Sequence, residues 1–231
     1  MTQNRKALPP PKSISPMPRY LVRQYDGWRD GSFAENKAWF ARLASTGQHP
    51  RAMLISCCDS RVDAVGMFGS EPGDLFVVRN VANLVPPYSP DHQHHGTSAA
   101  VEYAVNALKV AHIVVIGHST CGGVKACHDM CTGTAPELEE TSSFIGRWMD
   151  ILREPCNRVI AEGLTGPELA TRLEHEAVLT SLRNLETFPF VAEAIARGEL
   201  SLHGAWIDIG SGHLYTADTD GCFSPVRGNL D

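Results

Sequence analysis

The sequence lacks the features of several protein classes. Among its 231 residues, 20 Lys and Arg stand against 26 Asp and Glu, which gives a formal net charge of −6. No basic run is present, so the general attraction to phosphate backbones that nucleic-acid binding needs is absent. No apolar stretch approaches the ~18 residues that cross a bilayer, and the N-terminus, MTQNRKALPPPKS, has no apolar core of a secretory signal. We therefore expect a cytoplasmic protein that binds neither nucleic acid nor a membrane.

The cysteines do not form the pattern of a disulfide framework. Their number is odd, and no export signal accompanies them. They are Cys57, Cys58, Cys121, Cys127, Cys131, Cys156 and Cys222. In a reducing compartment, clustered cysteines are more often metal ligands or nucleophiles.

Short apolar segments alternate with helical patterns along the chain. Such alternation predicts an α/β fold, here a mostly parallel central sheet flanked by helices, with an antiparallel edge strand from a final hairpin. No linker divides the pattern, so we expect a single domain over residues 1–231. The expected strands are 52–56, 74–78, 112–117, 202–209 and 214–216, and the expected helices are 32–43, 97–110 and most of 136–198.

The first 30 residues are expected to form an N-terminal arm. Prolines cluster between residues 8 and 18, and proline-rich chain is extended. We expect this arm to lie over a partner subunit.

Metal-ligating residues follow two of the expected strands. Open α/β sheets bind ligands just beyond the carboxyl ends of their strands. Cys57 follows the first strand, and His118 and Cys121 follow the third. Two thiolates and one imidazole suit Zn2+ as a three-ligand catalytic set with an open fourth position. The alternative is a structural zinc knuckle, which normally has a fourth Cys or His.

An acidic and a basic residue lie beside the first candidate ligand. Asp59 and Arg61 are two residues apart, so they face one side if the chain continues extended. An arginine that binds an aspartate bidentately orients it and keeps it ionised. Next to zinc-bound water, such a carboxylate only accepts a proton. Because two thiolates neutralise the zinc charge, we expect the reaction to improve toward alkaline pH.

Three other patterns allow further interpretations. Residues 117–121, GHSTC, resemble the nucleophile elbow of α/β-hydrolases, but Cys121 in place of glycine would crowd the turn. Residues 92–95, HQHH, suit a second metal or a proton relay, although the preceding turn favours a solvated loop. Cys127 and Cys131 lie four apart, which suits a thiol pair or, in preference, buried apolar packing.

The glycines at 122 and 123 mark the start of a helix. The Lys-Ser/Thr that a P-loop requires does not follow them. We expect backbone N–H groups there to assist the zinc site, and we assign Gly122 to substrate binding.

The motifs resemble those of the β-class carbonic anhydrases. They are C-x-DSR at 57–61, EPGDLFVVRNVAN at 71–83 and HSTCGG at 118–123. The resemblance extends from about residue 48 to residue 125 and resumes at 203–209. It therefore covers most of the chain, with motifs that are specific in their length and order.

The resemblance implies an enzyme, a carbonate dehydratase of the lyase class. It implies reversible hydration of CO2 to bicarbonate and a proton by attack of zinc-bound hydroxide. Zinc is held by Cys57, His118 and Cys121, and Asp59 with Arg61 matches the catalytic dyad. The alternatives are hydrolysis of a CO2 analogue, CS2 or COS, on the same scaffold, and a non-catalytic zinc-binding protein.

The resemblance also implies a substrate pocket. Gln48, Phe76 and Tyr103 look like the pocket positions of the plant-like members, with Phe76 and Tyr103 reaching the pocket from a second subunit. A homodimer or higher homo-oligomer with the site at the interface is therefore expected. Another branch of the family closes its site at lower pH and carries a tryptophan where this chain has Leu54. We therefore expect a site that is open at neutral pH.

Two neighbours of the motif residues receive structural roles. The motif spacing selects Cys57 over Cys58 as the ligand, and we expect Cys58 to be a small buried residue. Arg79 is shared by both branches of the family, and we expect it to form a structural ion pair.

Overall fold

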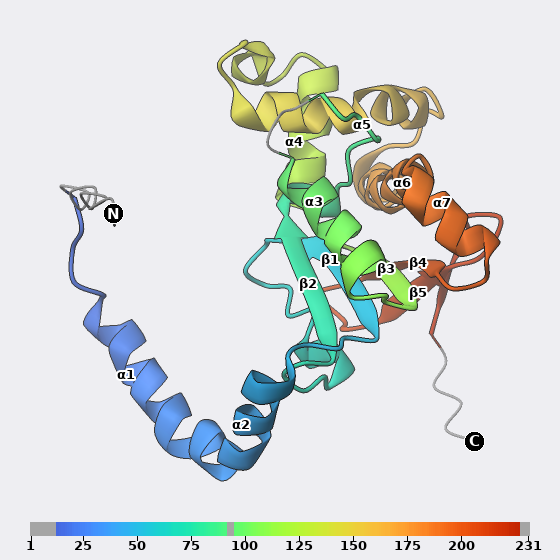
Figure 1. The fold of residues 1–231 in the computed structure, drawn as a ribbon. Helices are drawn as coiled ribbons and strands as arrows, with labels where there is room; N and C mark the ends of the chain where they lie inside the picture. The colour runs from blue at the N-terminus through green and yellow to red at the C-terminus, as the bar shows by residue number, and fades with distance from the viewer. Residues whose placement is uncertain (1–12, 92–94, 227–231) are drawn as a thin grey trace, which may run out of the picture. The chain divides into compact units, whose positions relative to one another are not determined.

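The computed structural model describes residues 13–91 and 95–226 of the chain (Figure 1). The chain divides into two units, Met1–Gln48 and His49–Asp231. The single domain over residues 1–231 stays a prediction. The expected histidine-rich site at 92–95 lies almost wholly outside the described residues.

The N-terminal unit is helical from Arg19 onward. Helix α1 is Arg19–Trp28, a π-helical turn follows at Arg29–Phe33, and α2 is Lys37–Thr46. The rings of Trp28, Phe33 and Phe40 lie 5.1–5.8 Å apart between centroids and join the two helices. The helix that begins at Arg19 is an addition to the sequence-based expectation, while the arm over residues 1–30 and its contact with a partner subunit stay predictions.

The second unit is built on a six-stranded sheet. Its strand order is β2-β1-β3-β4-β5-β6; the first four strands are parallel, and β5 pairs antiparallel with both β4 and β6. The predicted α/β fold with an antiparallel edge is confirmed, and the short edge strand β6 is an addition to it. The strands are β1 Ala52–Cys57, β2 Leu75–Asn80, β3 His112–His118, β4 Ser201–Ile207, β5 Leu214–Ala217 and β6 Phe223–Pro225.

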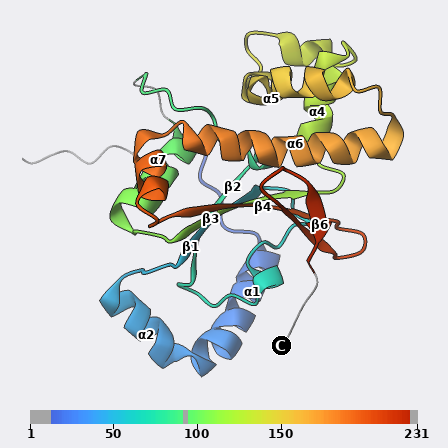
Figure 2. The ribbon, with the colours of Figure 1, turned by 90° about the vertical axis from the view of Figure 1, so that its right-hand side faces the viewer.

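Helices of this unit cover one face of the sheet. Helix α6 packs against β3 and β4, and α4 and α5 pack in turn on α6 and on each other (Figure 2). The helices are α3 Gly96–Glu102, extended by a π-helical turn at Tyr103–Ala107, α4 Gly122–Cys131, α5 Phe144–Ile160, α6 Gly166–Glu186 and α7 Pro189–Ala196. Short 3-10 turns lie at Gly66–Phe68, Val81–Asn83 and Pro136–Glu139. In the described residues we find no helix with the length and apolarity that a bilayer crossing requires.

Two glycines let α6 approach the sheet closely. A Cβ at Gly117 on β3 would lie 2.7 Å from a methyl carbon of Val178, and one at Gly204 on β4 would lie 3.0 Å from Leu182. Such contacts are closer than packed carbon atoms allow. The absence of a side chain at these positions therefore brings α6 against the strand that ends in His118.

Candidate metal centre

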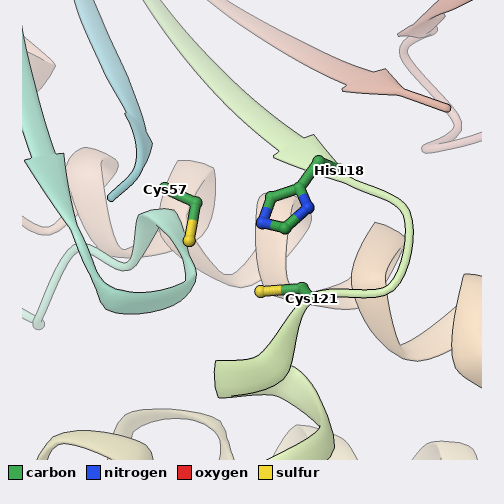
Figure 3. A group of neighbouring side chains, drawn as sticks. All are labelled: Cys57, His118 and Cys121. Carbon is green, nitrogen blue, oxygen red and sulfur yellow. The ribbon is translucent and has the colours of Figure 1, made fainter. Parts of the chain in front are cut away.

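Three potential metal ligands meet at the carboxyl edge of the sheet. Cys57 ends β1, His118 ends the neighbouring parallel strand β3, and Cys121 lies directly before α4. All three are buried, and their ligand atoms lie within 4.8 Å of one another. The two sulfur atoms and the imidazole point toward a common centre (Figure 3).

The imidazole of His118 is oriented for ligation. Its Nδ1 lies 2.9 Å from the carbonyl oxygen of Ser119. A carbonyl only accepts, so Nδ1 carries the proton and Nε2 has a free lone pair. Nε2 is buried with no hydrogen-bond partner among the described residues, a state that buried polar atoms rarely have. With two sulfur atoms beside it, this donor set fits Zn2+.

The surroundings of Cys57 and Cys121 favour a negative charge shared by the two sulfur atoms. A hydrogen bond from Cys121 lowers the pKa of Cys57 to about 4, and the same interaction raises the pKa of Cys121. Backbone N–H groups also face the sulfur atoms, from Asp59 and Ala82 at Cys57 and from Gly123 and Val124 at Cys121. The N-terminal end of α4 further favours a thiolate there.

The turn after β2 is strained where it faces Cys57. Ala82 and Asn83 have φ of +62° and +51°, in the left-handed region, at a cost of ~1 kcal/mol or more each. Neighbouring groups hold the turn in place. The side chain of Asn80 bonds to both backbone groups of Leu84, Trp148 Nε1 donates to Val81 O, and Ser181 Oγ donates to Asn83 O. Within this turn, the N–H of Ala82 faces the Cys57 sulfur.

Asp59 and Arg61 form a bidentate pair beside the three ligands. Arg61 Nε donates to Asp59 Oδ1 at 2.9 Å, and Nη2 donates to Oδ2 at 2.7 Å. These bonds hold the pKa of Asp59 well below its usual range. Arg61 also donates to the hydroxyl and the carbonyl of Thr120, both at 3.1 Å. The expected pairing is confirmed, and Arg61 also links the loops that follow β1 and β3.

Arg79 and Cys58 differ from their expected roles. Within residues 13–91 and 95–226, Arg79 pairs with no carboxylate; it donates to the carbonyls of Cys57, Asp59 and Val62 at 2.7–3.0 Å. It therefore fixes the backbone of the loop after β1. Cys58 is exposed, not buried, because β1 ends at Cys57 and Cys58 already belongs to that loop.

A buried glutamate that the sequence analysis missed supports the ligand loop. Glu174 on α6 is 4% exposed and accepts hydrogen bonds from the backbone N–H of Cys121 and from Trp206 Nε1, both at 3.1 Å. Burial raises the pKa of this carboxyl group. One signal was available in the sequence, because Glu174 lies on the same helical stripe as the buried residues Ala177, Val178 and Ser181.

The glycines at the start of α4 have different surroundings. A Cβ at Gly122 would meet nothing within 4 Å, whereas one at Gly123 would lie 2.7 Å from Val81 Cγ1 and 3.0 Å from Ala82 Cβ. Gly123 thus permits the contact between α4 and the strained turn. Gly122 also borders a cavity of about 420 Å³ between α4 and α6, whose lining includes Cys121 and Leu173.

We expect Gly123→Ala to destabilise the protein by ~1–3 kcal/mol, the usual cost of overpacking a filled site. Urea unfolding of the zinc-free protein measures this change. Gly122→Ala is the matched control, and we expect it to leave the free energy of unfolding unchanged or slightly higher. Equal stabilities of the two variants would contradict the close contact at Gly123.

Phe76, another predicted pocket residue, lies away from this centre within its own chain. Phe76 pairs with Met53, four residues before Cys57 along β1, which is ~13 Å at 3.3 Å per residue. The rings of Phe76 and Tyr103 lie 5.9 Å apart, and Tyr103 is 49% exposed. Gln48 is exposed and ends the N-terminal unit. The pocket roles of these residues stay predictions.

Comparison with known proteins finds one family. A family model described as "Carbonic anhydrase" matches residues 52–214. A carbonic anhydrase of Synechocystis sp. is 38% identical over 190 residues, which are 81% of this chain and 66% of that protein. The chain thus spans just under two thirds of that relative's length.

Solved structures agree with this similarity. The β-carbonic anhydrase CcaA is 34% identical, with a TM-score of 0.81 over 92% of this chain and 93% of that one. A structure from a study of two tetrameric β-carbonic anhydrases of the filamentous ascomycete Sordaria macrospora is 31% identical, with a TM-score of 0.72 over 89% of this chain and 98% of that one.

Proposed function

The chain belongs to the β-carbonic anhydrase family, and we propose that it catalyses the reversible hydration of CO2 to bicarbonate and a proton. The observation that carries this proposal is the buried cluster of Cys57, His118 and Cys121 next to an aspartate held by an arginine. A structural zinc site needs four protein ligands and has no use for such a dyad. Three ligands and an ionised carboxylate suit a hydration reaction.

Cys57, His118 and Cys121 would hold Zn2+ in this enzyme. A zinc ion there would supply Lewis acidity, which makes water a nucleophile near neutral pH. The N–H groups around both sulfur atoms and the carbonyl of Ser119 behind the imidazole orient the three ligands. Glu174 keeps the backbone of the 118–121 loop in place through Cys121.

Asp59 orients the attacking water. Arg61 donates to Oδ1 from both Nε and its backbone N–H, and to Oδ2 from Nη2, so Oδ2 is the oxygen that keeps a further lone pair. Because its pKa is held so low, Asp59 accepts a hydrogen bond from the nucleophile and cannot donate one. The nucleophile then has to direct its own lone pair elsewhere, toward the carbon of CO2. Arg61 acts as a positioning residue through Asp59.

The substrate pocket is completed by residues from outside this cluster. Gln48 donates its amide to a substrate oxygen, the N–H of Gly122 lies at the start of α4, and Phe76 and Tyr103 come from a second subunit. The distance of Phe76 from the ligands of its own chain supports that assignment. A homodimer or a higher homo-oligomer follows, as in the tetrameric relatives.

We expect the zinc-loaded protein to hydrate CO2 at neutral pH, with a rate that rises between about pH 6.5 and about pH 9. The rise reflects deprotonation of water at a metal that two thiolates make a weaker acid catalyst. Asp59 does not contribute to it, since a carboxyl group with a lowered pKa is already ionised throughout this range. Stopped-flow measurement of CO2 hydration tests the profile.

Each outcome of that experiment is informative. Turnover already present near pH 7 supports an open site, with Asp59 held by Arg61 and Leu54 in place of the tryptophan of the closing branch. Turnover that appears only above about pH 8 supports the proposed enzyme activity but contradicts a site that is open at neutral pH. No turnover at any pH with zinc bound contradicts the proposed reaction.

A further inference from the structure

A second group of cysteines lies between α4 and α5. Cys127 and Cys131 are one turn apart on α4, and Cys156 faces them from α5. The three sulfur atoms lie within 4.8 Å of one another. Cys127 is 1% exposed and Cys156 is 3% exposed, while Cys131 is partly exposed. Only the pairing of Cys127 with Cys131 was evident in the sequence, because Cys156 lies on another helix.

This group is separate from the candidate zinc site. Cys127 follows Cys121 by six residues, which is ~9 Å of helical rise. The two groups share no residue. Its surroundings are mostly apolar, with Met130, Met149 and Leu152 in the same buried cluster, and the buried Glu176 lines the same hollow as Cys127 and Cys156.

Among the described residues, these thiols make only weak hydrogen bonds, with one another and with two backbone carbonyls. Cys127 Sγ donates to Met149 O at 3.7 Å, and Cys131 Sγ donates to Arg153 O at 3.8 Å. Hydrogen bonds of such length from a thiol are weak. Replacing the thiol protons by a metal ion therefore breaks only weak hydrogen bonds.

The spacing of the sulfur atoms fits a three-coordinate metal ion. With a metal–sulfur bond of ~2.3 Å, three sulfur atoms at 120° lie ~4.0 Å apart. The observed separations of up to 4.8 Å need only a small contraction. In the described part of the chain, no histidine nitrogen or carboxylate oxygen joins the group within 4.8 Å, whereas zinc prefers four ligands.

We propose that Cys127, Cys131 and Cys156 form a second metal site, a trithiolate that binds a soft, thiophilic cation in three-coordinate geometry. Soft thiolate sulfur selects such ions over hard cations. Binding forms three metal–sulfur bonds and releases the thiol protons to solvent. With a divalent ion the site carries one negative charge, and the partly exposed Cys131 gives it access to water. The bound ion cross-links α4 and α5.

Cadmium titration of the full chain tests this site. Wild type is expected to retain two Cd2+ per chain after desalting, one at each cysteine group. Cys131→Ala is expected to retain one, and its thiolate-to-cadmium ultraviolet absorbance falls to about two fifths, because two of five ligating sulfur atoms remain. Cys222→Ser replaces an exposed cysteine outside both groups and is the matched control, with two ions expected.

Two further measurements keep the test decisive. Cys57→Ser disables the candidate zinc site and is expected to retain one Cd2+, with about three fifths of the absorbance, so the result does not depend on the proposed enzyme activity. If Cys131→Ala does not fold, 113Cd NMR of wild type is expected to show two resonances, one of them from a site with sulfur ligands only. A single ion per wild-type chain, or equal binding by wild type and Cys131→Ala, would overturn the proposal.

Discussion

Cys57→Ser is expected to lose both bound zinc and CO2 hydration. A hydroxyl is a much poorer ligand than a thiolate, and the buried Cys57 is one of only three ligands in the cluster. Apparent zinc-binding free energies of roughly 10–16 kcal/mol, shared among four ligands, leave ~3 kcal/mol for each. We therefore expect zinc affinity to fall at least ~100-fold. Competition with a chromophoric chelator measures the affinity, and stopped-flow hydration measures the activity.

Cys58→Ser is the matched control for that experiment. Cys58 adjoins Cys57 but is exposed, in the loop after β1. We expect this variant to keep one zinc ion and wild-type turnover. Loss of zinc from Cys58→Ser, with retention by Cys57→Ser, would reverse the ligand assignment.

Asp59→Asn is expected to lower kcat/KM by ~10²–10⁴-fold, the range found when a positioned proton acceptor is removed. The amide has the shape of the carboxylate, but it has no charge and has one oxygen fewer for Arg61 and the nucleophile. Its NH2 group donates hydrogen bonds, so it no longer forces the nucleophile to present a lone pair to CO2. Zinc content is expected to stay at one ion per chain.

Arg61→Lys separates positioning from charge. Lysine keeps the positive charge but not the bidentate contact with Asp59 or the second link to Thr120. We expect a smaller loss of kcat/KM than in Asp59→Asn. As the pH is lowered, the activity of this variant should begin to fall at a higher pH than that of wild type, because the pKa of Asp59 is no longer held as low. Wild-type turnover in Asp59→Asn would contradict the role of the dyad.

The principal residues of the candidate site were accessible from the chain alone, for a local reason. Cys57 and His118 each end a short apolar segment, and such segments form neighbouring parallel strands whose carboxyl ends meet at one edge. Asp59 and Arg61 are close enough in sequence for the loop to pair them. The α/β fold followed from the same alternation of apolar strands with helices.

Weaker local signals led to errors. No helix was predicted at Arg19–Trp28, where the aromatic contacts of Trp28 within its unit favour one. Strand β6 has only three residues and contains Pro225, so its pattern could not be separated from a loop. Arg79 appeared suited to a carboxylate, but backbone carbonyls, which leave no trace in a sequence, are its acceptors.

Contacts between distant segments account for the rest of the site. Glu174 reaches Cys121 across 53 residues because Gly117 and Gly204 let α6 lie against the sheet. The left-handed backbone of Ala82 is held by groups that include Trp148 and Ser181. Cys156 joins Cys127 and Cys131 only through the packing of α5 on α4. Ligand type and spacing are local properties of the chain, whereas the burial, orientation and support of those ligands arise from packing between helices and strands far apart in sequence.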